Sequence, residues 1–509
     1  MLQRVHQNYI QLAFFKLPKR NNTWRMITGK LALLMTSTTL LLFAFTNHAV
    51  AQDNLTLYNM KTVPQRIAIN PALKSDAGSF VGFPLVSSQQ FGFTNSTLSL
   101  GAVLSTIEQG NGDTTYLNLT KFAGLMKKTN FFGIDYSTDL LGIGFSIGKK
   151  NYLYLSSSLT FAARINYPGD LIALITEGNG GKNLDRTFNF DFGFDQIAYA
   201  DFGLGYSRKL MDDKLTVGAR YRYIKGISAF NTERNDLTFH TNPHGYDLTV
   251  SADLKFNASN SVGSMDSLND MANFDPTELT MQDVLQSKNS GYALDFGMEY
   301  RLTSAITITA SVRNIGKITW NTNVINAVSE HPGASYPFTG VDIDDLEPER
   351  PREIMGRIAD TLIDRFRLKQ TNTSFTTGLF ASFYLGGNYN IMKDHNVGVL
   401  FSGGVYQSYI NPAITLSWNS KLTNVLAISS SYTIANNSFA NLGLGFSLNL
   451  GPIQLYAVSD NLVGVFFPND VQNLSARVGI NITGKRQDEE KAAAKKEAQQ
   501  RKKAAKKNK

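Results

Sequence analysis

The stretch DFGLGYSRKLMDDKLTVGARYRYIKG, residues 201–226, decides what kind of fold this chain can form. In its second half, large apolar side chains alternate with polar or small ones. Strict alternation predicts a β-strand, because successive side chains of a strand leave opposite faces. The first half alternates in the same way, and Met211-Asp212-Asp213 is short enough to be the turn of a hairpin. One face of the second strand carries Leu215, Val217, Ala219, Tyr221 and Tyr223, and the other carries Thr216, Gly218, Arg220 and Arg222.

This two-faced pattern recurs along the chain up to the segment 472–484. A sheet that is apolar on one face and charged on the other, with no helices to cover it, is typical of a closed barrel in lipid. The composition agrees, because 42% hydrophobic residues and a mean hydropathy of −0.17 are too polar for a helical membrane protein. The predicted fold class is therefore all-β, an antiparallel transmembrane barrel.

The alternating segments number about fourteen, an even count as expected for a bacterial barrel. Short connections alternate with a set that includes all the long ones, which are 94–131, 166–195, 229–288 and 321–372. Short periplasmic turns opposite long external loops are the usual asymmetry, and both chain ends then fall on the periplasmic side. The strands are predicted within residues 79–93, 132–148, 152–165, 196–210, 214–228, 289–302, 305–320, 373–391, 396–408, 411–419, 422–434, 438–450, 453–466 and 472–484.

The first 51 residues are predicted to be a signal peptide. Arg25 and Lys30 precede an apolar run from Leu31 to Phe45, and Ala49-Val50-Ala51 is a small-x-small cleavage site. A membrane anchor is the alternative, but the run is too short to span a bilayer well. Residues 52–78 then form an N-terminal, plug-like segment without clear periodicity, expected in the lumen or at its periplasmic mouth.

The net charge of +8 is confined to the two ends of the chain. Residues 1–51 and 486–509 each carry a net charge of +6, so the body from 52 to 485 carries −4. Nucleic acid is therefore not an expected partner. The tail 486–509 is expected in the periplasm, where it either binds a partner such as an envelope protein or peptidoglycan, or only adds solubility. The chain has no cysteine, which excludes thiol catalysis and thiolate metal sites.

No catalytic, cofactor or metal site is predicted, and we do not expect an enzyme. His240 and His244 have the spacing of two metal ligands on a helix, but Pro243 between them argues for a loop. An acidic cluster from Asp342 to Glu349 lacks the glycine and the order of a calcium loop. The Gly-x-Gly pairs at 203–205 and 443–445 lie inside strands, where glycine would relieve crowding on the inner wall.

The inward-facing charges are the strongest site candidates. They either line a pathway or hold a plug, or they pair across the lumen and fill it. Trp320 and Trp418 stand at opposite strand ends on the apolar face, where they would lie at the membrane interfaces. Helices are expected in the long connections, after Pro168, from Pro276 to about Gln286, and after Pro351. The lumen-lining candidates are Arg220, Arg222, Asp295, Glu299, Arg301 and Arg313.

Several stretches together resemble a family of uncharacterised outer-membrane proteins that is known only as a domain of unknown function. The Asn70-Pro71-Ala72 motif and the strand count are also similar to the long-chain fatty-acid transporter superfamily and to some type IX secretion-associated barrels. The resemblance implies a barrel with an N-terminal plug and supplies neither a substrate nor functional residues. The stretches are Leu55–Met60, Ile69–Ala72, Asn166–Leu171, Tyr206–Leu210 and Lys214–Gly218.

Two functions follow as hypotheses. The first is a passive outer-membrane channel or transporter for a small molecule, with hydrophobic molecules among the candidates, and it rests on analogy of fold. The second is a non-transporting envelope scaffold whose loops or basic tail bind a partner protein or the cell wall. Outer-membrane lipid is the expected surrounding in both cases.

Overall fold

The computed structural model describes residues 54–97, 102, 104–109, 115–244, 248–261, 265, 280–337, 368–406, 409–435, 438–462, 464 and 472–484. All of these belong to the unit His48–Lys509. Among these residues, no helix is both long enough and apolar enough to cross a bilayer.

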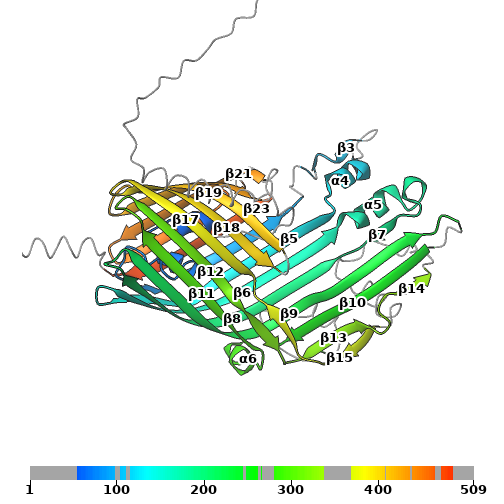
Figure 1. The fold of residues 1–509 in the computed structure, drawn as a ribbon, viewed down its shortest axis with the longest axis horizontal. Helices are drawn as coiled ribbons and strands as arrows, with labels where there is room; N and C mark the ends of the chain where they lie inside the picture. The colour runs from blue at the N-terminus through cyan, green and yellow to red at the C-terminus, as the bar shows by residue number, and fades with distance from the viewer. Residues whose placement is uncertain are drawn as a thin grey trace, which may run out of the picture. The chain divides into compact units, whose positions relative to one another are not determined.

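The fold is a closed antiparallel barrel of 14 strands, where β1 with β2 and β16 with β17 each count as one (Figure 1). Every strand pairs with a neighbour on both sides, and the predicted count and fold class are confirmed. In order around the wall, the strands are β5 (Thr129–Ile147), β6 (Asn151–Pro168), β8 (Gly193–Leu210), β9 (Leu215–Thr241), β11 (Ser290–Arg301), β12 (Ile306–Trp320), β16 (Phe375–Gly378) with β17 (Ala381–Met392), β18 (His395–Tyr406), β19 (Tyr409–Lys421), β20 (Leu426–Ala435), β21 (Ser438–Leu450), β22 (Ile453–Ser459), β23 (Asn473–Thr483), and β1 (Ser79–Gly82) with β2 (Gln89–Asn95).

The barrel closes where the first strand meets the last. Phe80 of β1 lies opposite Thr483 of β23 on one side and opposite Gly144 of β5 on the other. Strand β2 repeats this double pairing further along. Closure leaves no edge strand in the wall. Every backbone N–H and C=O group of the wall can then bond a neighbouring strand, which matters where apolar surroundings offer no other partner.

The wall is apolar outside and polar inside. On β19, Ile414, Leu416 and Trp418 are 46%, 56% and 41% exposed, whereas Thr415 and Ser417 between them are buried. The β8–β9 hairpin does the same with outward Leu204 and Tyr221. This distribution is the reverse of that in a water-soluble protein, in which the large apolar side chains are the buried ones.

All four of the predicted long loops contain strands, and in three of them these strands join the barrel sheet. Strand β9 continues to Thr241, well past its predicted end, and its second half pairs with β10 rather than with β11. Aromatic side chains such as Phe230 and Phe256 pack across these strands, 6.1 Å between ring centroids. We call this region the sheet extension. Besides the end of β9, it comprises β7 (Thr187–Asn189), β10 (Leu248–Asn260), β13 (Val324–Ser329), β14 (Ala334–Pro337) and β15 (Leu368–Thr371).

The helices that follow β1 are short and lie in the long connections. The helix predicted after Pro168 is confirmed as α5 (Gly169–Glu177). The described part of the second is α6 (Met281–Gln286), which begins after the Thr280 cap, while Pro276 lies outside the described residues. The helix after Pro351 and the acidic cluster also lie outside them. The remaining elements are α4 (Leu119–Leu125), η2 (Gly181–Asn183), β3 (Ile107–Gln109) and β4 (Thr115–Leu117).

The prediction for Trp320 was wrong, because a β-bulge reverses the faces of β12. Residues 313 and 314 of β12 together face one residue of β11, and Asn314 adopts a positive φ of 59°. Beyond the bulge, the parity of the strand changes, so Trp320 points inward. It is fully buried and its indole donates to Thr377 Oγ1 at 2.9 Å. Trp418 does face outward, stacked against His395.

Residues 54–76, which we call the luminal segment, lie inside the wall. They contain α2 (Leu55–Tyr58) and the 3₁₀ helix η1 (Pro64–Ala68). Apolar side chains of the segment form one cluster with inward-facing wall residues, and the Tyr58 ring stacks on Tyr384 of β17. The cluster comprises Leu55, Leu57, Tyr58, Met60, Val63, Ile69 and Leu73 of the segment with Tyr384, Leu400, Ala413, Ala435, Tyr456 and Val458.

Hydrogen bonds tie the luminal segment to strands all around the barrel. Tyr58 Oη donates to Thr309 of β12 at 2.9 Å, and Asn59 Nδ2 donates to Ser417 of β19 at 3.0 Å. Gln65 exchanges hydrogen bonds with Asn481 of β23 at 2.7 and 3.0 Å. The segment therefore bridges the lumen instead of lining one side of it. Its role as a plug stays a prediction.

Glycines on the inner wall make room for the luminal segment. A Cβ on Gly218 of β9 would lie 2.5 Å from the carbonyl carbon of Pro71 and 2.7 Å from the amide nitrogen of Ala72. Gly443 and Gly445 of β21 similarly face Thr56 and Met60. The Asn70-Pro71-Ala72 motif thus packs against backbone that tolerates no side chain, which explains glycine at these wall positions.

We predict that Gly218→Ala destabilises the barrel by about 1–3 kcal/mol, because the added methyl overlaps backbone that cannot move without the whole segment moving. The matched control is Gly387→Ala on β17, where an added Cβ meets nothing within 4 Å. Urea unfolding of both variants in detergent gives the comparison. Equal midpoints for the two variants would contradict the close packing of Pro71 on β9.

Candidate functional site

A buried ion cluster occupies the inner wall between β8, β9 and β11. Asp295 of β11 accepts a hydrogen bond from Arg220 Nε at 2.7 Å and another from Arg222 Nη2 at 3.3 Å. Arg222 also reaches Asp201 of β8 at 3.3 Å. All four side chains are nearly fully buried. They come together because Asp295 is paired with Arg220 in the strand register, two residues from Arg222 along β9.

The same carboxylate supports the bulge that reverses β12. Asp295 Oδ1 accepts the backbone N–H of Asn314 at 2.7 Å, which satisfies an amide that the bulge removes from the ladder. The Asn314 side chain in turn accepts from Arg222 and donates to the Phe380 carbonyl at 2.8 Å. One aspartate therefore holds two arginines and one backbone irregularity in place.

The cluster also contacts the luminal segment. Arg220 Nη2 donates to the carbonyl of Ala68 at 3.2 Å, at the end of η1. Ser311 of β12 donates to the carbonyl of Ile69 at 3.1 Å. Arg220 therefore pairs with a carboxylate on the adjacent strand and also bonds the luminal segment, whereas the expected pairing across the lumen is not what this cluster does.

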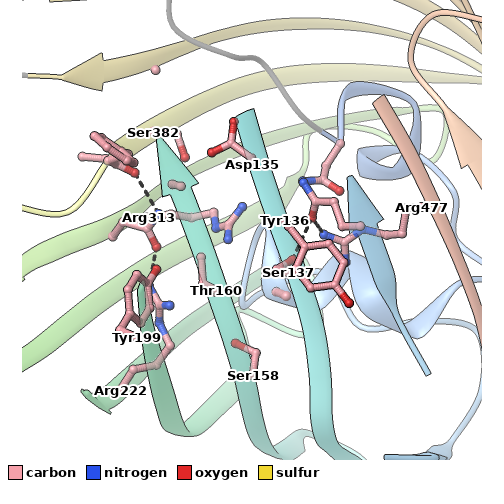
Figure 2. Close-up of a pocket in the computed structure, with 18 of the residues that line it drawn as sticks. Asp135, Tyr136, Ser137, Ser158, Thr160, Tyr199, Arg222, Arg313, Ser382 and Arg477 are labelled. Atoms are coloured by element: carbon pink, nitrogen blue, oxygen red, sulfur yellow. Dashed lines mark hydrogen bonds between the residues drawn. The ribbon is translucent and has the colours of Figure 1, made fainter. Parts of the chain in front are cut away.

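A polar cavity of about 160 Å³ lies on the long-loop side of the segment (Figure 2). We call it the long-loop cavity. Five arginines from four strands surround it, and Arg164 pairs with Asp135 at 2.6 Å and covers the ring of Phe380. Its charged lining residues are Asp135, Asp139, Arg164, Arg220, Arg222, Arg313 and Arg477.

A second and larger cavity, of about 500 Å³, lies on the short-turn side. We call it the short-turn cavity. Burial lowers the pKa of Lys61, Arg66 and Lys74, because each charge loses hydration there. Six cations and two carboxylates line it: Lys61, Arg66, Lys74, Lys150, Lys209 and Arg301, with Asp76 and Glu299.

The luminal segment separates these two cavities, and the order of residues along one strand makes this clear. On β9, Thr216 lines the short-turn cavity, Gly218 contacts Pro71 of the segment, and Arg220 lines the long-loop cavity. On β12, Thr307 lines the short-turn cavity and Arg313 lines the long-loop cavity. Ser311 lies between them and donates a hydrogen bond to the segment. The lumen is thus two polar compartments with a partition between them.

The six predicted lumen residues divide between these places. Arg220, Arg222 and Asp295 form the ion cluster, Arg313 lines the long-loop cavity, and Glu299 and Arg301 line the short-turn cavity. Sequence reasoning missed three groups of charged lining residues. These groups are Asp135, Asp139, Arg164 and Arg477 in the long-loop cavity, Lys61, Arg66, Lys74 and Asp76 from the luminal segment, and Lys150 and Lys209 at the turns. Strand parity could have found Arg164 and Arg477, whereas nothing in the sequence pattern marks Lys61, Arg66 or Lys74.

The two histidines with metal-like spacing lie in different local structures. His240 is part of strand β9, with Nε2 at 3.7 Å from Asp185 Oδ1, and His244 lies in the following turn. Among the residues described, no group of three or more metal-ligand side chains comes together.

We predict that Asp295→Asn lowers the free energy of unfolding by about 3–5 kcal/mol, because it leaves two buried guanidinium groups without their shared counter-charge. The matched control is Asp253→Asn in the sheet extension, whose pair with Arg234 is partly exposed and should contribute about 0–1 kcal/mol. Chemical denaturation reports both losses. Equal losses in the two variants would contradict the central place of Asp295.

Solved structures that match this chain share little sequence identity with it. They include the toluene transporter TbuX of Ralstonia pickettii (11% identity, TM-score 0.37, 83% of this chain and 94% of that chain covered). Others are a FadL homologue of Pseudomonas aeruginosa (10%, 0.36, 82% and 91%) and the toluene transporter TodX of Pseudomonas putida (10%, 0.32, 86% and 93%). At such scores, these similarities say nothing about what the present chain binds.

No curated protein matches the sequence. A family model does match, over residues 71–460, and its description is a family of unknown function (DUF5723). The match begins within the Asn70-Pro71-Ala72 motif and ends just after β22, so it covers most of the wall. The predicted membership of an uncharacterised family is confirmed, and the chain belongs to the family of unknown function DUF5723.

Proposed function

We propose that this protein is an outer-membrane channel for a small polar molecule, and that its luminal segment gates it. The observation that carries the proposal is the division of a polar lumen into two cavities by a segment that is not part of the wall. A barrel filled only for stability would be expected to have a continuous core. Here both sides of the partition keep space and charge.

The outer face supports a membrane location. Large apolar side chains are exposed on strand after strand, for example Leu204, Tyr221, Leu385 and Leu416. A continuous exposed apolar surface of this extent is not stable in water, whereas lipid matches it. The short turns then face the periplasm and the sheet extension faces outward, by the usual asymmetry of such barrels.

The partition must move for anything to pass. The contacts of the luminal segment are distributed around the whole wall, and its apolar cluster is buried, so the closed arrangement is the stable one. Transport then requires a local displacement of the segment, with the wall staying intact. The ion cluster at Ala68 and the hydrogen bonds at Thr56 and Gln65 are the contacts that such a displacement would break.

The linings favour polar cargo over a hydrophobic molecule. The long-loop cavity is bounded by arginines, aspartates and serines, and the short-turn cavity by lysines and arginines. An apolar solute would gain little from burial there, because the charged groups would lose hydration without gaining partners. The resemblance to hydrocarbon transporters therefore does not extend to the proposed cargo.

A second candidate is a non-transporting scaffold in the envelope, and the sheet extension favours it. Strands β10, β13 and β15 continue the sheet beyond the closed wall, which provides a protruding surface for a partner. The basic tail, the other feature behind this hypothesis, lies outside the described residues. A folded barrel that never conducts would favour this candidate.

The membrane location predicts a depth-dependent cost of charge on the outer face. Leu416→Arg, in the middle of β19, should destabilise the inserted barrel by about 2–4 kcal/mol, because the charge would lie in hydrocarbon. Leu422 is similarly exposed, at 48%, but lies in the turn after β19, so Leu422→Arg should cost about 0–1 kcal/mol. Folding into lipid vesicles at graded urea measures both. Equal costs would argue against a bilayer around β19.

The gating proposal predicts that a cross-link between segment and wall blocks passage. Thr56 Oγ1 and Ser431 Oγ of β20 lie 2.7 Å apart, and the chain has no native cysteine. The pair Thr56→Cys and Ser431→Cys should therefore form a disulfide that holds α2 against β20. We expect most of the flux of small charged solutes into proteoliposomes to be lost on oxidation and restored by a reductant.

The matched control joins two wall strands and leaves the segment free. Thr415 Oγ1 and Thr433 Oγ1, on β19 and β20, lie 2.8 Å apart and are equally buried. A disulfide between cysteines at these positions should leave the flux unchanged. Unchanged flux in the oxidised Thr56–Ser431 variant would refute gating by the segment, and absent flux in the wild-type protein would refute the channel itself.

A further inference from the structure

Arg66 is a buried cation that forms no ion pair within 4 Å with any described residue, although Glu299 and Asp76 are near enough to favour its charge. It lies in η1 of the luminal segment and is 4% exposed. Among the described residues, its Nε has no hydrogen-bond partner, and its guanidinium makes no ion pair within 4 Å. Arg220 and Arg222 show the contrast, since both are equally buried and each is paired with Asp295.

A second unsatisfied donor lines the same cavity. Ser75 Oγ is buried and has no hydrogen-bond partner among the described residues. Lys61 Nζ makes one bond, to Asn390 Oδ1 at 3.3 Å, which leaves two of its three hydrogens for another acceptor. Arg66 and Lys61 can only donate, and the Ser75 hydroxyl, which can also accept, has a hydrogen to donate as well.

The charge of the short-turn cavity points the same way. Six cations face two carboxylates there, which leaves a formal excess of positive charge in a space of about 500 Å³. Only one ion pair involves a lining residue, between Lys209 and Asp213 at 3.5 Å, counting described residues alone. A buried, unpaired guanidinium is costly, and a bound anion removes that cost.

We propose that the short-turn cavity is a binding site for a small oxyanion, a phosphoryl or carboxylate group that Arg66, Lys61 and Lys74 bind with the hydroxyl of Ser75. Arg66 supplies a planar pair of donors that matches either group, and the lysines supply point charges. The cavity is within the size range of small-molecule sites. Binding here needs only the closed barrel, so it can be measured without measuring transport.

The test is calorimetric titration of the full mature chain in detergent, with inorganic phosphate and with succinate as separate probes. We expect the wild-type protein to bind at least one probe, and Arg66→Gln to weaken that binding tenfold or more, since a charge-assisted hydrogen bond contributes roughly 1.5–3 kcal/mol. Phosphate alone binding would assign a phosphoryl group, and succinate alone a carboxylate.

Two further variants keep the result interpretable. Lys149→Gln removes the same charge from the exposed residue next to Lys150 but outside the lining, and should leave affinity unchanged. If Arg66→Gln does not fold, Lys74→Gln with Arg301→Gln decides instead, because both side chains are less buried. The proposal is overturned if folded wild-type protein binds neither probe. It is also overturned if Lys149→Gln loses as much affinity as Arg66→Gln. Neither result bears on flux, which the disulfide variants test separately.

Discussion

Closure of the sheet is the constraint on which the rest of this structure depends. A wall with lipid-compatible side chains outside can leave no backbone group unpaired, so the first strand must meet the last. That requirement puts β1 and β2 between β5 and β23, and thereby sets where the chain enters the barrel. The residues just before β1 then have only two places to go, the lumen or the short-turn mouth. They lie in the lumen.

A closed wall of 14 strands also encloses an interior that something must fill. Side chains from the wall alone do not fill a barrel of this width. The luminal segment supplies the missing core, with Leu57 and Tyr58 packed among inward-facing residues such as Leu400. The packing between segment and wall is uneven, because the segment has no repeating pattern and the strands of the wall do. The glycines at 218 and 443 are where the wall adapts to the segment, and the two cavities are where it does not.

The same contrast between repeating wall and non-repeating interior explains what the sequence could predict. Alternation at Leu215–Tyr223 depends only on the strand period, so strand number and inward charges followed from it. The position of Trp320 did not, because it depends on a single extra residue at Asn314, whose amide bonds Asp295 on another strand. The sheet extension was missed for a similar reason. Its strands have aromatic residues such as Phe230 on a face that packs against protein, and the outward-apolar rule does not describe them. Arg66 carries no local signal at all, since its burial is a property of the lumen.

The composition of the short-turn cavity links anion binding to the state of the partition. Arg66, Lys61 and Lys74 belong to the luminal segment, whereas Lys150, Lys209 and Arg301 belong to the wall. A ligand that contacts both groups binds the docked segment better than a displaced one, and by linkage it stabilises the docked state. At a concentration one hundred times its dissociation constant, a ligand that binds the docked state alone adds about 2.7 kcal/mol to docking. An oxyanion would then be a regulator that closes the barrel, unless it is also the cargo. A cargo must lose affinity as the segment moves, so the contacts made by η1 would have to break before those made by the wall. Arg66 lies on η1, so a cargo would have to lose its contact with Arg66 before it leaves the wall, whereas a regulator would keep that contact. Whether this contact breaks first therefore distinguishes the two roles.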